Sequence, residues 1–149
     1  MEKLKRAIEE IAKYNPSFKK IEVNNWVLDD SYSYDGSTVT GKEITKVLYY
    51  LSNYLCDNKV EITNHFERYA TMIDLSRNAV YKVEYFKSVI RRQAMMGINT
   101  ILLYTEDTYE VKDLPYFGYM RGRYLESEIK ELVEYAEIFG NELMPCIQT

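Results

Sequence analysis

The sequence predicts an α/β protein whose C-terminal half forms a parallel sheet. From residue 69 onward, short runs of β-type residues alternate with segments of helical periodicity. Gly97 and Gly140 follow the two helical segments, where a residue with positive φ commonly ends a helix. Strands that alternate with helices pair in parallel through right-handed crossovers. The helices then cover a face of the sheet, as in a doubly wound fold or a (β/α)8 barrel.

Composition narrows the class of protein before any element is placed. The chain has 149 residues and a net charge of −4, so a nucleic-acid or anionic-membrane surface is not expected. Its two cysteines, Cys56 and Cys146, make no disulfide framework, and no Cys/His spacing resembles a metal site. We therefore expect no cofactor and no metal. Because no signal-peptide or membrane-length apolar run occurs, we expect a cytoplasmic protein.

Residues 1–66 are predicted to form a small α/β domain. Apolar residues from Leu4 to Ile11 recur at helical spacing, and the stretch 18–28 alternates as a strand does. Asp35-Gly36 indicates the turn of a hairpin. Thr40 and Glu43 have the spacing of a capping box for a helix over about 41–55, and Val60 and Ile62 suggest a further short strand.

Residues 67–149 are predicted to form the second domain, with the pattern βαβαβ. Its expected elements are a strand at 69–74, a helix at 83–94, a strand at 100–104, a helix at 129–136 and a strand at 143–147.

Polar residues follow each of these three strands. Asp74 and Arg77 follow the first, Glu106 and Asp107 the second, and Gln148 the third. In parallel α/β sheets, sites are built at the carboxyl ends of strands. In an extended chain, Glu106 and Asp107 point to opposite faces, so we expect one to face a pocket and the other to support the loop.

Two side chains that could be reactive, a histidine and a cysteine, fit structural roles better than the roles of general base and nucleophile. His65, the only histidine, is expected on the surface or in the core, and Cys146 is expected to be buried packing inside an apolar strand.

Four separated motifs resemble the start of the catalytic barrel in glycoside hydrolase family 20, the exo-β-N-acetylhexosaminidases, and are most similar to its intracellular bacterial branch. The resemblance covers about residues 66–149 and lies in the segments Asp74–Val80, Leu103–Tyr109, Tyr116–Tyr124 and Met144–Thr149. It implies a small N-terminal α/β domain followed by the first three β/α units of a truncated (β/α)8 TIM-type barrel.

The resemblance also implies roles for single residues. Arg77 matches an arginine that hydrogen-bonds the hydroxyls of a terminal N-acetylhexosamine, Asp107 matches an acidic position supporting that subsite, and Glu106 is its commonly acidic neighbour. The residues expected to support this rim are Asp74, Tyr109, Arg121 and Gln148.

Three positions depart from the commoner family pattern. Gln148 and Cys146 replace an aspartate and a glutamate. Leu125 replaces a helix-capping Thr or Ser, so the cap is expected to move to Ser127 or to be absent.

Members of this family use the substrate's own acetamido carbonyl as nucleophile, with an Asp-Glu pair after the fourth barrel strand. No residue of this chain matches that pair, so we expect an inactive N-terminal fragment. Its sheet would lack partners, which predicts self-association or pairing with the missing barrel portion. Two alternatives stay open: a stand-alone non-catalytic module that binds a sugar or a protein, and, ranked last, another small α/β enzyme with Glu106 or Asp107 as general base.

Overall fold

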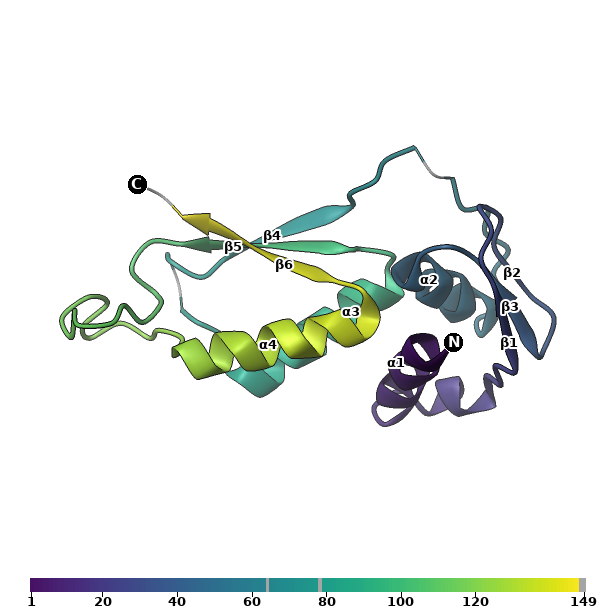
Figure 1. Cartoon of the computed structure of the whole chain (residues 1–149), viewed down its shortest axis with the longest axis horizontal. Coiled ribbons are helices and arrows are strands. Elements are labelled where there is room, and N and C mark those ends of the chain that lie inside the picture. The colour runs from purple at the N-terminus through teal and green to yellow at the C-terminus, as the bar shows by residue number, and fades with distance from the viewer. Residues whose placement is uncertain (64, 78, 148–149) are drawn as a thin grey trace.

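The computed structural model describes residues 1–63, 65–77 and 79–147. Its N-terminal part packs helices against a small sheet at one end of the molecule (Figure 1). The elements of this part are α1 (Glu2–Ala12), a 3-10 helix (Pro16–Lys20), β1 (Asn25–Val27), β2 (Ser33–Tyr34), β3 (Thr38–Thr40) and α2 (Ile44–Tyr54).

The small sheet has the strand order β1-β3-β2, with β3 parallel to β1 and antiparallel to β2. The predicted hairpin turn joins β2 to β3. There, Asp35 Oδ1 accepts hydrogen bonds from the backbone N–H groups of Ser37 and Thr38, at 2.9 and 2.7 Å. Gly36 has φ +100°, a conformation that favours glycine. Local side-chain chemistry therefore defines this turn, as the sequence indicated.

The C-terminal part is the predicted βαβαβ unit. Its three strands pair in parallel in the order β4-β5-β6. Both helices end where the sequence predicted, because Gly97 and Gly140 adopt positive φ values of +79° and +76°. The elements are β4 (Ala70–Asp74), α3 (Val83–Met95), β5 (Thr100–Thr105), α4 (Glu126–Phe139) and β6 (Glu142–Ile147).

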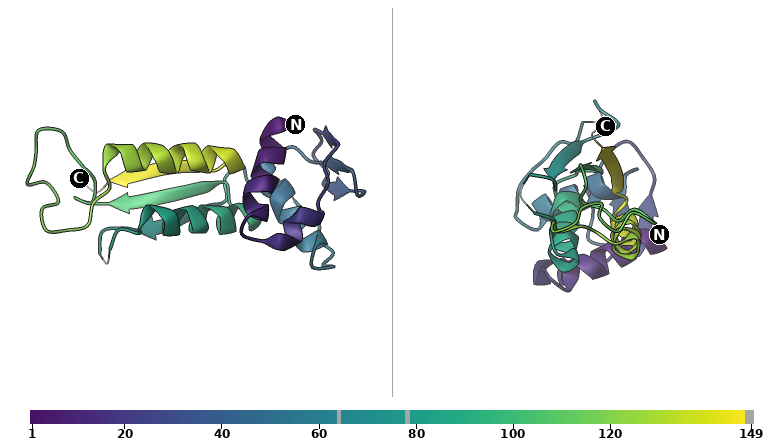
Figure 2. Two further views of the ribbon diagram at one scale, coloured as in Figure 1. Left: turned by 90° about the horizontal axis from the view of Figure 1, so that it is seen from below. Right: turned by 90° about the vertical axis from the view of Figure 1, so that its left-hand side faces the viewer.

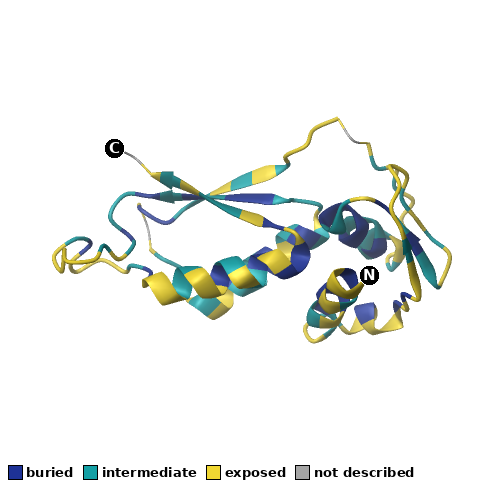
Figure 3. Ribbon diagram, viewed as in Figure 1, coloured by how far each residue is buried: buried dark blue, intermediate teal, exposed yellow. Residues whose placement is uncertain are grey.

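Helices α3 and α4 lie side by side and cover one face of this sheet (Figure 2). On β5, Ile101 and Leu103 face the helices and are buried, whereas the alternate residues Leu102 and Tyr104 are only partly buried. The opposite face lies open, and Met72 on the neighbouring strand is 57% exposed there (Figure 3). This half-covered parallel sheet matches the expected start of a (β/α)8 barrel.

A single cluster of buried apolar side chains joins the two parts of the chain. Helix α1 packs against α4, and α2 packs against α3. Leu4 and Leu48 from the first part and Phe86 and Phe139 from the second are fully buried in this cluster. The predicted domain boundary between residues 66 and 67 falls in the connection from α2 to β4 and stays a prediction.

Several local expectations are wrong. The α2 helix begins at Ile44 with Glu43 as N-cap, so Thr40 ends β3 and caps nothing. No strand forms at Val60 and Ile62. Phe18 lies in a 3-10 turn in which it alone is buried, because Asn15 caps that turn and Pro16 begins it.

The capping of α4 agrees with the second of the two expected alternatives, because the N-cap residue provides no side-chain cap. Leu125 is the N-cap, and its apolar side chain makes no cap hydrogen bond, while Ser127 lies inside the first turn. Two glutamates accept the orphan N–H groups. Glu128 Oε2 accepts from Leu125 N at 2.8 Å, and Glu110 Oε2 accepts from Glu126 N at 3.3 Å.

The cysteines and the histidine take unremarkable positions. His65 and Cys56 are exposed. Cys146 is half-buried on β6 and so is less buried than the expected packing role requires, because one face of the sheet is uncovered. Within residues 1–63, 65–77 and 79–147, no helix combines the length and apolarity needed to cross a membrane.

Candidate functional site

The candidate site lies at the carboxyl ends of β4 and β5, where the long loop 106–125 leaves the sheet (Figure 1). Parallel pairing places Asp74, the last residue of β4, beside Tyr104 of β5. Glu106 and Asp107 follow directly after β5. The two strand ends therefore bring together residues that lie about thirty positions apart in the sequence.

Asp74 organises the turn that follows β4. Its Oδ1 accepts hydrogen bonds from the backbone N–H groups of Ser76 and Arg77, at 2.9 and 3.0 Å. The N–H of Arg77 contributes most to holding the pKa of Asp74 below its usual range, against the opposing effect of partial burial. The ionised carboxylate thus fixes the backbone from which the Arg77 side chain projects.

Arg77 presents its guanidinium group to solvent. The side chain is 73% exposed, and its Nε lies 3.6 Å from Asp74 Oδ2. The guanidinium carbon lies 5.6 Å from the centre of the Tyr104 ring, on the open face of the sheet. Stacking on an aromatic ring and contact with a carboxylate orient the planar group without covering it.

Arg121, from the far end of the loop, returns to the same place. Its Nη1 lies 2.5 Å from Asp107 Oδ1 and 3.7 Å from Glu106 Oε2. Its Nη2 donates to the carbonyl oxygen of Ser76. The chain bends at Glu106 and Asp107, so both carboxylates approach one guanidinium group instead of pointing to opposite faces.

Two buried hydroxyl groups flank this arrangement. Ser76 Oγ and Thr108 Oγ1 have no hydrogen-bond partner among the described residues. Most buried side-chain polar atoms in folded proteins have a hydrogen-bond partner. Ser76 lies two residues beyond the end of β4. No local signal distinguishes its buried hydroxyl from an exposed one.

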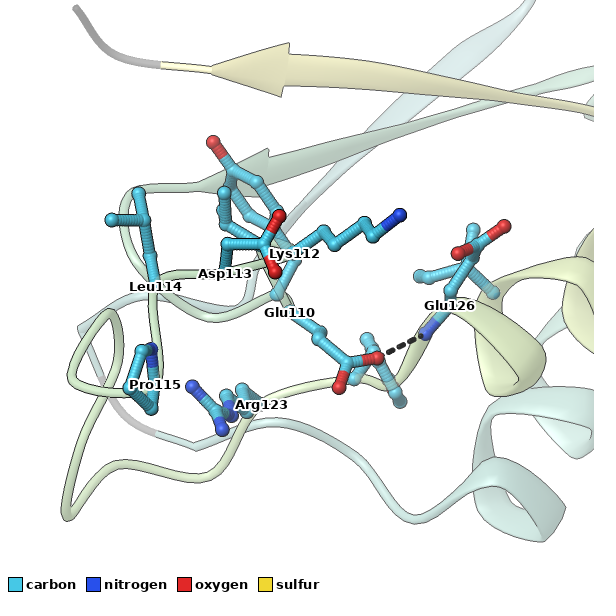
Figure 4. Close-up of a pocket in the computed structure, with 11 residues that line it drawn as sticks. Glu110, Lys112, Asp113, Leu114, Pro115, Arg123 and Glu126 are labelled. Atoms are coloured by element: carbon cyan, nitrogen blue, oxygen red, sulfur yellow. Dashed lines mark hydrogen bonds between the residues drawn. The ribbon is translucent and has the colours of Figure 1, made fainter.

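Tyr109 lies apart from the two arginines. Its ring packs edge-on against Phe117, with the ring centres 5.2 Å apart, and its backbone forms a bridge with Tyr124. It lines a hollow of about 690 Å³ between the loop and the start of α4 (Figure 4). Arg77, Glu106, Asp107 and Arg121 do not line this hollow.

Of the predicted rim, the structure brings together Asp74, Arg77, Glu106, Asp107 and Arg121, and it places Tyr109 in the neighbouring hollow. Gln148 lies outside the described residues. No group of three or more metal-binding side chains occurs in the described part of the chain. The site therefore offers exposed guanidinium donors and carboxylate acceptors, the groups that hydrogen-bond a polyhydroxylated ligand.

Neither a known family's sequence model nor any curated protein sequence matches this chain. Solved structures do match it. An exo-β-N-acetylglucosaminidase of glycoside hydrolase family 20 from Vibrio harveyi, in complex with N-acetylglucosamine, superposes with a TM-score of 0.74 at 17% identity. The match covers 96% of this chain and 30% of that one.

Two Streptomyces enzymes match similarly. A mutant β-hexosaminidase from Streptomyces plicatus in complex with its product GlcNAc has a TM-score of 0.69 at 16% identity, covering 97% of this chain and 39% of its own. The family 20 β-N-acetylhexosaminidase from Streptomyces coelicolor A3(2) has a TM-score of 0.66 at 15% identity, covering 95% and 39%. This chain therefore shares the fold of the matched part of these enzymes and spans about a third of their length.

Proposed function

We propose that this chain is part of a glycoside hydrolase of family 20, which removes terminal β-linked N-acetylhexosamine by substrate-assisted retaining hydrolysis. Two independent observations support the proposal. The fold is shared with enzymes whose structures hold N-acetylglucosamine. The motifs that resemble the family also supply Arg77, Asp107 and Arg121, which meet at one rim.

The observation that carries the proposal is the exposed guanidinium group of Arg77 at the carboxyl end of β4. Asp74 fixes its backbone and Tyr104 supports its plane. A planar donor held in this way can give two parallel hydrogen bonds to neighbouring hydroxyl oxygens of a sugar. In this proposal Arg77 binds the terminal sugar, and Asp107 and Glu106 complete the acceptor side of the subsite.

The chain itself would bind sugar and would not hydrolyse it. In substrate-assisted hydrolysis, one acid orients the acetamido group and a second protonates the leaving oxygen. The described carboxylates of the rim contact Arg77 and Arg121 and therefore face cations. The N–H of Arg77 holds the pKa of Asp74 below its usual range, so this carboxylate is suited to accept hydrogen bonds and not to protonate a leaving oxygen.

The uncovered face of the β4-β5-β6 sheet would meet a further part of the barrel or a second copy of this chain. Met72 on β4 is 57% exposed on this face, and Met144 and Cys146 on β6, which pair with Leu102 and Tyr104, are only partly buried there. Both strands are edges of the sheet. Sedimentation at high protein concentration tests self-association, and a strictly monomeric profile would contradict it.

Sugar binding is the direct test. Saturation-transfer NMR with N-acetylglucosamine and N-acetylgalactosamine should detect weak binding to the purified chain. Arg77→Met should abolish the signal, because it removes the donors and keeps much of the side-chain volume. Arg92→Met is the matched control, since Arg92 is exposed on α3 away from the rim. Equal signals from both variants would contradict the proposed subsite.

Turnover is tested separately with an aryl β-N-acetylglucosaminide. We expect no release of the aryl group by the purified chain. Measurable hydrolysis would contradict the proposal that this chain binds the sugar without cleaving it. Sequencing the coding DNA beyond the codon for Thr149 offers a further test. An open frame leading to an Asp-Glu pair would support the hydrolase, whereas an immediate stop codon would favour a stand-alone binding module.

A further inference from the structure

We propose that Arg121 is a positioning residue that acts through Asp107 and does not itself bind the ligand. The inference rests on the proposed function, because it assigns a role within the sugar-binding rim. It starts from the way the guanidinium group divides its donors. Nη1 contacts the Asp107 carboxylate at 2.5 Å, and Nη2 donates to the Ser76 carbonyl oxygen. One planar group therefore joins the ends of two strands.

The loop that carries Arg121 is held over Asp107 by its backbone as well. Gly118 has φ +66°, and a Cβ atom at this position would lie 2.2 Å from the carbonyl oxygen of Asp107. Only glycine permits this close approach of two backbone segments. Within the loop, Arg123 donates to the carbonyl oxygen of Phe117. The backbone of Gly118 and the side chain of Arg121 thus both contact Asp107.

The two arginines of the rim have different surroundings. Arg121 directs both terminal nitrogens to protein oxygens and is 38% exposed, whereas Arg77 is 73% exposed. Donors already engaged with protein acceptors add little when a ligand arrives, because one hydrogen bond is exchanged for another. Arg77 is therefore the binding arginine, and Arg121 is the one that sets the geometry.

Charge balance explains why a guanidinium group is needed at this point. Glu106 and Asp107 are adjacent and both approach Arg121, at 3.7 and 2.5 Å. Without the cation, the two carboxylates repel each other. The Ser76 carbonyl oxygen would also lose its donor. Both effects would loosen the turn that carries Arg77, so removal of Arg121 should disturb a residue that it does not touch.

Hydrogen exchange and sugar binding together test this role. In Arg121→Gln, the backbone amides of Arg77, Glu110 and Tyr124 should exchange faster, since their hydrogen bonds hold the turn and the loop. Amides of β5 should keep wild-type rates. The affinity for N-acetylglucosamine should fall by about tenfold. Arg121→Lys should restore the charge but only part of the ordering, because an ammonium group lacks the planar fork.

Lys112→Gln is the matched control, because Lys112 is an exposed cation on the same loop. It should change neither exchange nor affinity. Loss of affinity in Arg121→Gln with unchanged exchange would make Arg121 a direct ligand and overturn the proposal, as would unchanged values of both. Absence of sugar binding in the wild-type chain would refute the proposed function instead, and the exchange rates would still decide whether Arg121 orders the rim.

Discussion

The Tyr135 hydroxyl group in α4 donates a hydrogen bond to Glu10 Oε1 in α1, at 2.8 Å, although 125 residues separate them. The same hydroxyl oxygen accepts from Arg91 Nη1 at 2.6 Å. Arg91 is buried, and its guanidinium carbon lies 3.6 Å from the centre of the Tyr14 ring. This network links α1, α3 and α4, and burial is the main cause that raises the pKa of Tyr135.

Tyr135→Phe should lower the free energy of unfolding by about 1–2 kcal/mol, because Arg91 and Glu10 each lose a hydrogen-bond partner in a largely buried site. Urea unfolding followed by circular dichroism measures the effect. Tyr14→Phe is the control. It keeps the ring under Arg91 and should change stability by less than about 0.5 kcal/mol. Equal losses in the two variants would contradict the role of the network.

The same network predicts a pH dependence. Burial of the Glu10 carboxyl group opposes ionisation, but hydrogen bonds from Lys13 and Tyr135 outweigh it and lower the pKa in the folded state. The stabilisation is therefore present above the usual carboxyl range and is lost as the pH falls through the folded-state pKa. The stability difference between wild type and Glu10→Gln should shrink from about pH 7 to about pH 3. A difference independent of pH would contradict this origin.

Gly118→Ala should disturb the loop more than the same substitution at a glycine of positive φ with free space around it. Its Cβ atom would meet the Asp107 carbonyl oxygen at 2.2 Å, so the loop must move away from the rim. Gly140→Ala is the matched control, since its φ is +76° and its Cβ would make only ordinary contact with Ile44 at 3.6 Å. The control should cost about 1–2 kcal/mol in unfolding free energy. Gly118→Ala should additionally weaken N-acetylglucosamine binding, which NMR titration measures.

Shortening an apolar side chain to alanine should affect stability differently on the two faces of the C-terminal sheet. Ile101 is fully buried under the helices, so Ile101→Ala should lower the unfolding free energy by about 2–5 kcal/mol. Met72 lies on the uncovered face, and Met72→Ala should cost less than about 0.5 kcal/mol in the monomer. Urea unfolding at low protein concentration compares them. A large cost for Met72→Ala would indicate that this face is covered in solution.

Much of the fold could be predicted from local patterns. Apolar spacing located α1, α3 and α4, alternating β-type runs located β4, β5 and β6, and glycines ended two helices. The predictions that failed depended on weaker local signals. Thr40 and Glu43 had the right spacing for a capping box, yet pairing of Thr40 with β1 and β2 left it in a strand. Val60 and Ile62 found no neighbouring strand with which to pair.

In the candidate site, too, local patterns predict the position of some residues but not the contacts between distant segments. The placement of Asp74, Arg77, Glu106 and Asp107 at strand ends could be predicted from the sequence, since periodicity and strand ends are local properties of the chain. The contacts of Arg121 with Asp107 and the Ser76 carbonyl oxygen, and the cap that Glu110 provides for α4, form only when the chain folds. Those contacts join segments 14, 45 and 16 residues apart. Their partners are chosen by strand pairing and loop geometry, which leave no periodic signal in the sequence.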